Sequence, residues 1–459
     1  MKLRMGISGM LCVLGLTVQG ASPREIAREG GSPVAPPRVS RGEPWTLDQT
    51  IRFALTNNPN AKIAQHRIAA AKAGLDQANA AFSPQLQFQS SYTRSDNPVF
   101  VFGSILNQRS YSDNLNFNDV PDNDNINARG LLTMPLYAGG KNVAVRDAAK
   151  ANDRAARLDA TAVRNSLVFE VARAFFTVLK TREFIQATEA GVRDFETNVA
   201  LAERRFNVGT LLKSDVLDVE VRLAQAREEA VHARNANTLA MRALRNLLGI
   251  EEGEFEVKNS PIGTENLPSD AADFHERPEL AASAQKVAAA EADVRRSTSG
   301  YKPRVSAFGS LDYDYGTITD GDGKSYTAGA MLQWDIWDGL NAHAKRQEAK
   351  ANLETAREQE RQLRLALDLE LEQARLALRE AAERLAVTEK TVAQATESVE
   401  LTRARFEQGV ALATQLIDAE TALTAARVRR AEALADKYIS IAAVRKAVGL
   451  SQFSAQDSP

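Results

Sequence analysis

"RFNVGTLLKSDVLDVEVRLAQAR" occupies residues 205–227, and "RFEQGVALATQLIDAETALTAAR" occupies residues 405–427. The two stretches align without a gap, and nine of the 23 positions are identical. The identical pairs are Arg205/Arg405, Phe206/Phe406, Gly209/Gly409, Leu212/Leu412, Asp218/Asp418, Glu220/Glu420, Leu223/Leu423, Ala226/Ala426 and Arg227/Arg427. Gly209 and Gly409 suit the position with positive φ that ends a helix. Each stretch therefore predicts a corner between two helices, made twice in one chain.

The offset of 200 residues continues upstream of the corners. Residues 131–152 match residues 331–352, and both end in Ala-Lys-Ala-Asn. Still earlier the offset becomes 219, because Pro84 matches Pro303. The first copy therefore has 19 extra residues, and the stretch 95–125 is rich in Asn, Asp, Ser and Pro. This composition is typical of a loop, so we expect the insertion there.

The repeat predicts the organisation of the whole chain. We expect a first structural repeat at residues 45–250, a linker at 251–272 and a second structural repeat at 273–450, with a short tail at 451–459. The linker contains several Gly and Pro residues. The 459-residue chain is thus two copies of one unit rather than three unrelated domains.

The N-terminus has the layout of a secretory signal peptide, with Lys2 and Arg4 ahead of an apolar run of about 14 residues. This predicts a signal peptide at 1–20 and a flexible segment at 21–44, whereas the alternative is a buried N-terminal helix. The single cysteine, Cys12, lies in the apolar run. The mature protein would then have no disulfide and no cysteine-based metal site.

Four segments alternate apolar and polar residues with a period of two, at about 84–95, 126–137, 303–315 and 326–337. In the first, the residues Leu86, Phe88, Ser90 and Tyr92 share a face. Segments of about 10–12 residues with this pattern are typical of transmembrane β-strands that face lipid on one side and water on the other. The alternative is a soluble amphipathic sheet.

The longest helices have a heptad pattern. Core positions alternate in steps of four and three from Leu167 to Phe206 and again from Leu367 to Phe406. This indicates coiled-coil packing, and a helix over 340–407 would be roughly 100 Å long. Four strands cannot close a membrane barrel, since the smallest has about eight. Several chains must therefore share one barrel, which the helices continue as a tube.

At this point the sequence resembles the TolC-type outer-membrane efflux proteins over residues 45–450. The corner "RFNVGTLLKSDV" is similar to the family's Arg-Phe-x-x-Gly…Ser/Thr-Asp-Val pattern. The resemblance implies a mainly α fold with a membrane β-barrel: a homotrimer with a 12-stranded barrel in outer-membrane lipid and an α-helical barrel in the periplasm. It also implies two partners, a periplasmic membrane-fusion adaptor and an inner-membrane transporter of RND, ABC or MFS type. The function would be export through a channel-tunnel.

In the family, acidic residues just after the corners narrow the periplasmic entrance. The matching positions here are Asp215, Asp218, Gln415 and Asp418, and glutamine stands at 415 where some relatives have an aspartate. The alternative for each aspartate is a capping or solvated helix residue.

The resemblance also makes the corners the periplasmic tips. The residues expected to dock the adaptor are Gly209, Thr210, Leu211, Gly409, Val410 and Ala411. In the best-known member a tyrosine and an arginine that help lock the closed state stand at the positions of Phe406 and Ala411. The same locking network is therefore not expected here.

Other chemistry finds little support. The four histidines, His66, His232, His275 and His343, are scattered, so neither a metal site nor a catalytic triad is predicted. A formal net charge of −2 gives no basic field for nucleic acid. We expect no cofactor and no enzymatic activity. The alternatives to a duct are an exported coiled-coil structural or adhesive protein and an exported enzyme.

Overall fold

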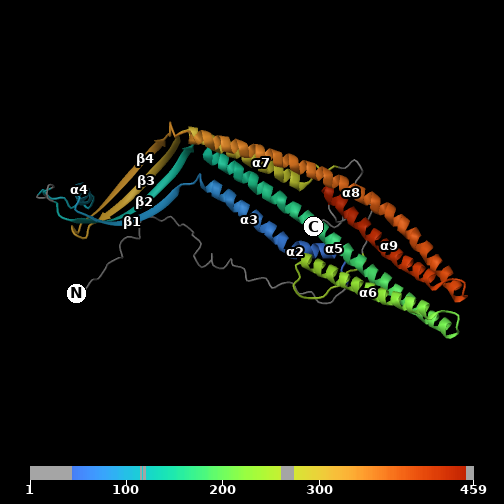
Figure 1. The fold of residues 1–459 in the computed structure, drawn as a ribbon. Coiled ribbons are helices and arrows are strands. Elements are labelled where there is room, and N and C mark those ends of the chain that lie inside the picture. The colour runs from blue at the N-terminus through green and yellow to red at the C-terminus, as the bar shows by residue number, and fades with distance from the viewer. Residues whose placement is uncertain (1–43, 114–115, 117–119, 260–272, 451–459) are drawn as a thin grey trace, which may run out of the picture.

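The computed structural model describes residues 44–113, 116, 120–259 and 273–450. The predicted signal peptide, nearly all of the segment 21–44, most of the linker and the tail lie outside these residues. The described chain is elongated, with a sheet at one end and long helices running from it to the other end (Figure 1).

Equivalent elements follow one another in the two repeats. The first has α2 (Leu47–Asn57), α3 (Pro59–Ala80), β1 (Gln85–Ser95), α4 (Pro98–Asn107), β2 (Asn123–Ala138), α5 (Lys141–Asn207) and α6 (Lys213–Leu248). The second has α7 (Pro278–Ser297), the short 3₁₀ helix η2 (Thr298–Tyr301), β3 (Arg304–Tyr315), β4 (Asp322–Gln333), α8 (Asn341–Glu407) and α9 (Ala413–Ala447). Helices α5 and α8 have 67 residues each and begin 200 residues apart, at 141 and 341. The mainly α fold with four strands is confirmed.

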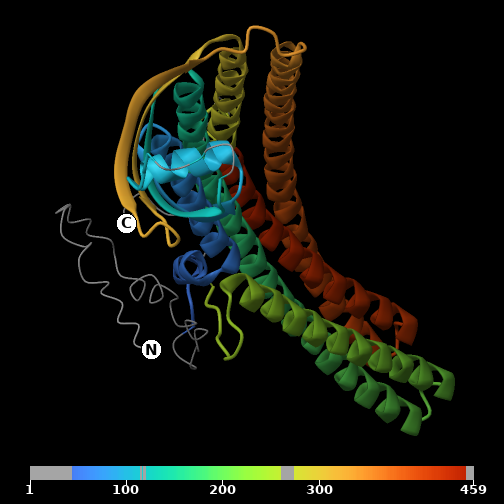
Figure 2. The ribbon, with the colours of Figure 1, turned by 90° about the vertical axis from the view of Figure 1, so that its left-hand side faces the viewer.

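The strands form one antiparallel sheet in the order β1-β2-β3-β4. Leu86 pairs with Leu132, and Leu132 pairs with Gly309 on β3. The face that carries Leu86 and Leu132 also carries the exposed side chains of Leu311 and Tyr326. Polar residues of the opposite face bond across the sheet, where the Arg129 Nε–Asp312 Oδ1 distance is 2.5 Å and the Asn127 Nδ2–Asp314 Oδ1 distance is 3.0 Å. The sheet is strongly curved (Figure 2).

Strand β4 ends at Gln333, whereas the alternation had suggested about 337. Two polar contacts explain the earlier end. Asp335 pairs with Arg304 at 2.9 Å, and Oδ2 of Asp338 accepts from the backbone N–H of Ala342 at 2.7 Å. The chain therefore turns into α8 where apolar alternation alone would have continued the strand.

The stretch 95–125 is not entirely a loop, because α4 occupies Pro98–Asn107. The helix begins with a standard cap: the Asn97 side chain accepts from the N–H groups of Val99 and Phe100, and Pro98 occupies the first turn. The loop expectation is wrong for these ten residues. The polar composition around them masked a short apolar helix.

The main core lies midway along the helices, where α2, α5, α6 and α9 meet. Phe175 and Phe176 of α5 are fully buried, and the Phe176 ring stacks on Tyr438 of α9 with centroids 5.0 Å apart. Leu244 and Ile441 complete the same cluster. A smaller core lies near the corners. Within the described residues, no helix combines the length and apolarity needed to cross a membrane.

Candidate functional site

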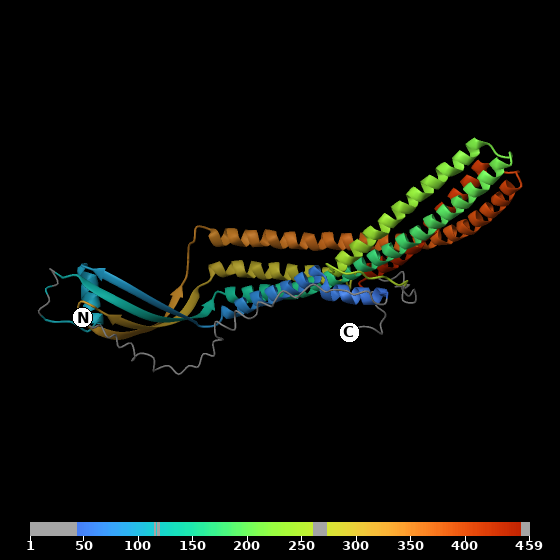
Figure 3. The same cartoon turned by 90° about the horizontal axis from the view of Figure 1, so that it is seen from below.

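The two corners end the helical hairpins α5–α6 and α8–α9 side by side at the far end of the molecule (Figure 3). Gly209 and Gly409 adopt φ of 76° and 80°, which confirms the predicted helix-ending role. The N–H of Thr210 donates to the carbonyl of Arg205 at 2.9 Å, and Val410 donates to Arg405 at 2.9 Å. These are the backbone bonds of a glycine-terminated helix.

Asp215 and Gln415 hold equivalent capping positions. Asp215 Oδ2 accepts from the N–H of Leu212 at 3.4 Å, and Gln415 Oε1 accepts from the N–H of Leu412 at 3.1 Å. Either side chain can satisfy this donor, which explains how glutamine replaces aspartate in the second copy. Both residues therefore have a structural role at the start of a helix.

Asp218 and Asp418 lie one turn further along α6 and α9, and both are exposed. Their neighbours Val219 and Leu416 turn into the core of the corners. The structure thus separates the four predicted entrance residues into two caps and two solvent-facing carboxylates.

Arg205 joins the two corners. Its guanidinium Nη1 donates to the carbonyl of Phe406 at 2.6 Å, and its Cζ lies 4.8 Å from the centre of the Phe406 ring. Its Nη2 lies 3.3 Å from the carbonyl of Thr210. A cation over an aromatic face and a bond to a backbone carbonyl do not require a tyrosine hydroxyl. Phe406, fully buried, therefore ties the second corner to the first through Arg205.

The six predicted docking residues do not share one environment. Val410 is 76% exposed, and Gly209, Thr210 and Gly409 are also exposed, whereas Ala411 is only 8% exposed and packs in the core of the corners. Leu211 packs against the same core. Ala411 and Leu211 therefore pack inside the corners and are not part of an exposed docking surface.

Sequence reasoning missed three exposed apolar side chains beside the corners: Val208, Leu212 and Leu412. Leu212 and Leu412 are identical in the two copies, and this identity was a signal that could have found them. Together with Val410 they give the end of the molecule an apolar surface, which we call the tip surface.

A buried polar cluster lies further up the hairpins. Glu420 of α9 is almost fully buried, with Oε1 2.5 Å from Arg403 Nη2 and 3.1 Å from Asn198 Nδ2. Asp194 lies within 3.7 Å of Arg403 and 3.5 Å of Arg427. The equivalent Glu220 is only partly buried, so the repeat in sequence did not reveal this cluster.

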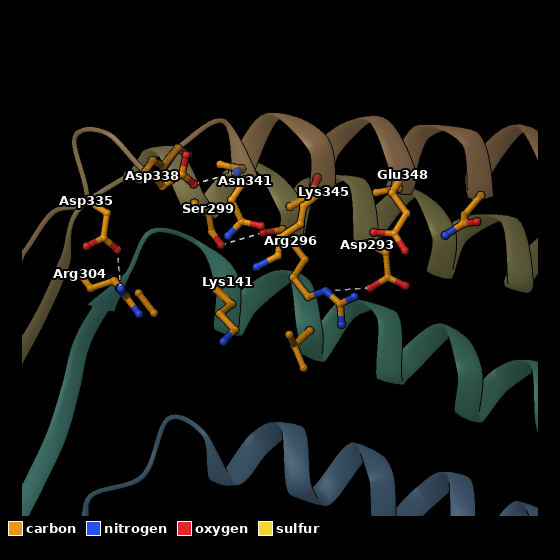
Figure 4. A pocket seen from close by; sticks show the side chains of 18 of the residues that line it. Lys141, Asp293, Arg296, Ser299, Arg304, Asp335, Asp338, Asn341, Lys345 and Glu348 are labelled. Atoms are coloured by element: carbon orange, nitrogen blue, oxygen red, sulfur yellow. Dashed lines mark hydrogen bonds and ion pairs between the residues drawn. The ribbon is translucent and has the colours of Figure 1, made fainter.

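A cavity of about 640 Å³ lies at the other end, between α5, α7 and α8 near the sheet (Figure 4). Its lining carries both signs of charge, including Lys141, Arg296 and Glu348. Arg296 pairs with Asp293 at 3.2 Å. Among the described residues, no group of three or more His, Cys, Asp or Glu side chains could hold a metal ion.

Comparison with known proteins identifies the class. The outer membrane efflux protein family matches residues 50–250 and 272–450. Because these ranges cover most of the chain, the protein belongs to the outer membrane efflux protein family. It is an outer-membrane channel protein rather than an enzyme.

Its relatives are distant but cover most of its length. The outer membrane protein TolC of Vibrio cholerae is 22% identical over 73% of this chain and 80% of its own. The pyoverdine export outer membrane protein OpmQ of Pseudomonas aeruginosa is 23% identical over 83% of this chain and 80% of its own.

Solved structures show the same fold. The outer-membrane channel OprN has a TM-score of 0.77 at 20% identity, with 88% of this chain and 90% of that chain covered. The outer membrane protein VceC of Vibrio cholerae has a TM-score of 0.75 at 19% identity, with 89% and 97% covered.

Proposed function

We propose that three copies of this chain form an outer-membrane channel-tunnel of a tripartite efflux or type I secretion system. The observation that supports it most is the open sheet: the order β1-β2-β3-β4 leaves β1 and β4 as edge strands in the described chain. Open edges cannot stay unpaired in lipid. Three chains would supply 12 strands, three times the four of this chain, and would close a barrel.

The helices would continue this barrel through the periplasm. Helices α5 and α8, with 67 residues each, extend roughly 100 Å from the sheet. The tip surface then lies far from the outer membrane, at the level where a periplasmic adaptor and an inner-membrane transporter would meet it. Exposed apolar side chains at the end of a rod are typical of a protein interface.

The exposed carboxylates Asp218 and Asp418 would form two rings at the narrow end of the trimer. If neighbours in a ring lie about 8 Å apart, each pair repels by about 2 kcal/mol at an effective dielectric near 20. Such rings attract cations and bind multivalent ions. We therefore assign the entrance selectivity to these two residues and a capping role to Asp215 and Gln415.

Arg205 would hold the entrance closed. Its contact with Phe406 spans the two hairpins that must separate for the tube to widen, and it uses a backbone carbonyl and a ring in place of a tyrosine hydroxyl. Arg205→Ala should therefore raise the open fraction of the channel. The matched control is Arg405→Ala, at the equivalent position of the second corner.

Two measurements test the proposal. Native mass measurement in mild detergent should give three chains, and a stable monomer would overturn the barrel argument. Cross-linking in cells, followed by capture of the channel, should recover an adaptor and an inner-membrane transporter. One relative is a pyoverdine export protein and another is an alkaline protease secretion protein, so cargo differs between similar channels. The identity of the captured transporter therefore decides the cargo class.

A further inference from the structure

Helix α4, in the insertion that only the first repeat carries, folds back over the polar face of the sheet. Figure 2 shows it lying across the concave side of the strands. Ser104 Oγ accepts from Asn123 Nδ2 of β2 at 2.7 Å. Val101 and Ile105 are buried on the same side of the helix. The helix is therefore packed against its own sheet instead of projecting away from it.

The C-terminal end of α4 is fixed by Gln108, which is 1% exposed. Its Nε2 donates to the carbonyl of Asp124 on β2 at 2.6 Å, and its Oε1 accepts from Thr319 Oγ1, beyond β3, at 2.6 Å. Asp124 in turn accepts from the N–H of Ile318 at 3.0 Å. One glutamine thus joins the helix to strand β2 and to the turn between β3 and β4.

Two glycines make room for this approach. A Cβ on Gly323 of β4 would lie 1.7 Å from the carbonyl oxygen of Asn107, and a Cβ on Gly321 would lie 1.7 Å from Ser110 Oγ. Gly323 pairs with Asp314, on the polar face. Any other residue at these positions would push the end of α4 away, so the sequence just before β4 and at its start is adapted to an inward-folded helix.

The opposite side of α4 is apolar and exposed. Val99 is 81% exposed and Leu106 is 45% exposed, seven residues apart and hence on one side of the helix. Phe102, between them, is 40% exposed. The ten residues 98–107 carry no charge, so copies of this helix can approach one another without repulsion.

We propose that α4 is a plug at the extracellular mouth, where the three copies of the helix meet along Val99 and Leu106. This rests on the proposed trimer, because closing the barrel turns the polar face inward and brings the copies together around the axis. Barrels of about eight strands are filled by side chains and those of 16–18 leave an aqueous channel. Three helices, each about 10 Å across, would occupy much of the space inside a 12-stranded barrel.

Disulfide trapping tests the contact directly. The only native cysteine, Cys12, is changed to alanine, and Val99→Cys or Leu106→Cys is added. Mild oxidation should give disulfide-linked dimers, with one subunit of each trimer left over because three copies pair two at a time. Val101→Cys, buried against its own sheet, is the matched control and should stay uncrosslinked.

Accessibility tests the plug itself and does not depend on the periplasmic entrance. Gln87→Cys places a thiol on the polar face of β1, near the strand end away from α4. A bulky, membrane-impermeant maleimide added outside whole cells should label it slowly. Adding Leu106→Asp, which puts three carboxylates where the helices meet, should accelerate labelling severalfold, whereas Leu106→Met should not.

The outcomes separate the two proposals. A trimer by native mass that shows neither disulfide at 99 or 106 nor faster labelling with Leu106→Asp would overturn the plug and leave the channel-tunnel standing. A protein that forms no trimer would overturn both. Dimers with Leu106→Cys together with faster labelling with Leu106→Asp would establish the plug.

Discussion

Helices α3 and α7 begin at equivalent prolines, Pro59 and Pro278, but the residue before each proline differs. In the first repeat Asn58 donates from Nδ2 to the carbonyl of Leu247 at 2.7 Å. In the second repeat the same position is Arg277, whose side chain is only 4% exposed. It pairs with Glu279 at 2.7 Å and with Glu370 at 2.6 Å. One joint is neutral and the other is ionic. We therefore expect the two joints to respond differently to mutation and to pH, although their backbones are alike.

The corners differ in the same way. A Cβ on Gly409 would lie 3.2 Å from Arg205 Nη2, whereas a Cβ on Gly209 would meet nothing within 4 Å. The first corner supplies the arginine and the second receives it. The two repeats are therefore alike in backbone but unlike in the side-chain contacts that join their corners.

The largest expected effect is at the corner glycines. Gly409→Val and Gly209→Val each force a branched residue to φ near 80°, at a cost of about 1–2 kcal/mol, and both should reduce export strongly while the trimer remains in the outer membrane. Gly409→Val should in addition raise the open fraction of the channel, because its Cβ would crowd the Arg205 guanidinium. Export assays with quantified outer-membrane trimer check this. Unchanged export in both variants would place the docking surface elsewhere.

The next largest effect is expected at the ionic joint around Arg277. Arg277→Ala leaves two carboxylates without their buried partner and should lower the free energy of unfolding by about 2–3 kcal/mol. This is below the range for breaking a fully buried pair, because Glu279 and Glu370 are partly exposed. Asn58→Ala, at the neutral joint, should cost about 1–2 kcal/mol. Thermal dissociation of the trimer compares them. A larger loss with Asn58→Ala would contradict the ionic interpretation.

The same joint predicts a difference in acid. Burial by itself raises the pKa of Glu370, but hydrogen bonds from Arg277 and Lys446 outweigh it and hold the pKa below its usual value. Its contribution to stability is therefore complete above the usual pKa of a glutamate and is lost as the pH falls through the lowered value. Amide exchange in α7 and α9 should rise in acid before exchange in α3 and α6. Glu370→Gln should remove that difference, and a difference that persists would assign it to another group.

Much of the fold could be predicted because apolar periodicity and the repeat both depend on backbone geometry. The pattern ending at Phe206 and Phe406 placed the ends of α5 and α8 within a residue or two. Helix α4 could not be placed, since the Asn, Asp and Ser residues around Pro98–Asn107 give the stretch the composition of a loop. The contact from Arg205 to Phe406 spans 201 residues and left no local signal.

A smaller effect is expected at the acidic positions. The double variant Asp218→Ala/Asp418→Ala should lose block by di- and trivalent cations and part of its cation selectivity, since each carboxylate pair in a proposed ring would contribute about 2 kcal/mol of repulsion that a bound cation relieves. Planar-bilayer recordings measure both quantities. Asp215→Asn, which keeps an oxygen for the Leu212 N–H, is the control and should retain the block. Identical block in the double variant and the unaltered channel would make both aspartates ordinary solvated residues.

The smallest expected effect comes from the two turns that lead into the long helices. Gly140 precedes α5 at φ 86°, and its equivalent before α8 is Leu340 at φ 69°. A leucine in this left-handed region is strained by about 1–2 kcal/mol, and the greater freedom of an unfolded glycine returns roughly half of that. Leu340→Gly should therefore raise the free energy of unfolding by up to about 1 kcal/mol, since the leucine side chain is mostly exposed and little packing is lost. Gly140→Leu, where a Cβ meets nothing within 4 Å, should lower it by a similar amount. Thermal dissociation of the two trimers measures the pair, and a stability loss with Leu340→Gly would show that Leu340 packs against a neighbouring copy in the assembled tube.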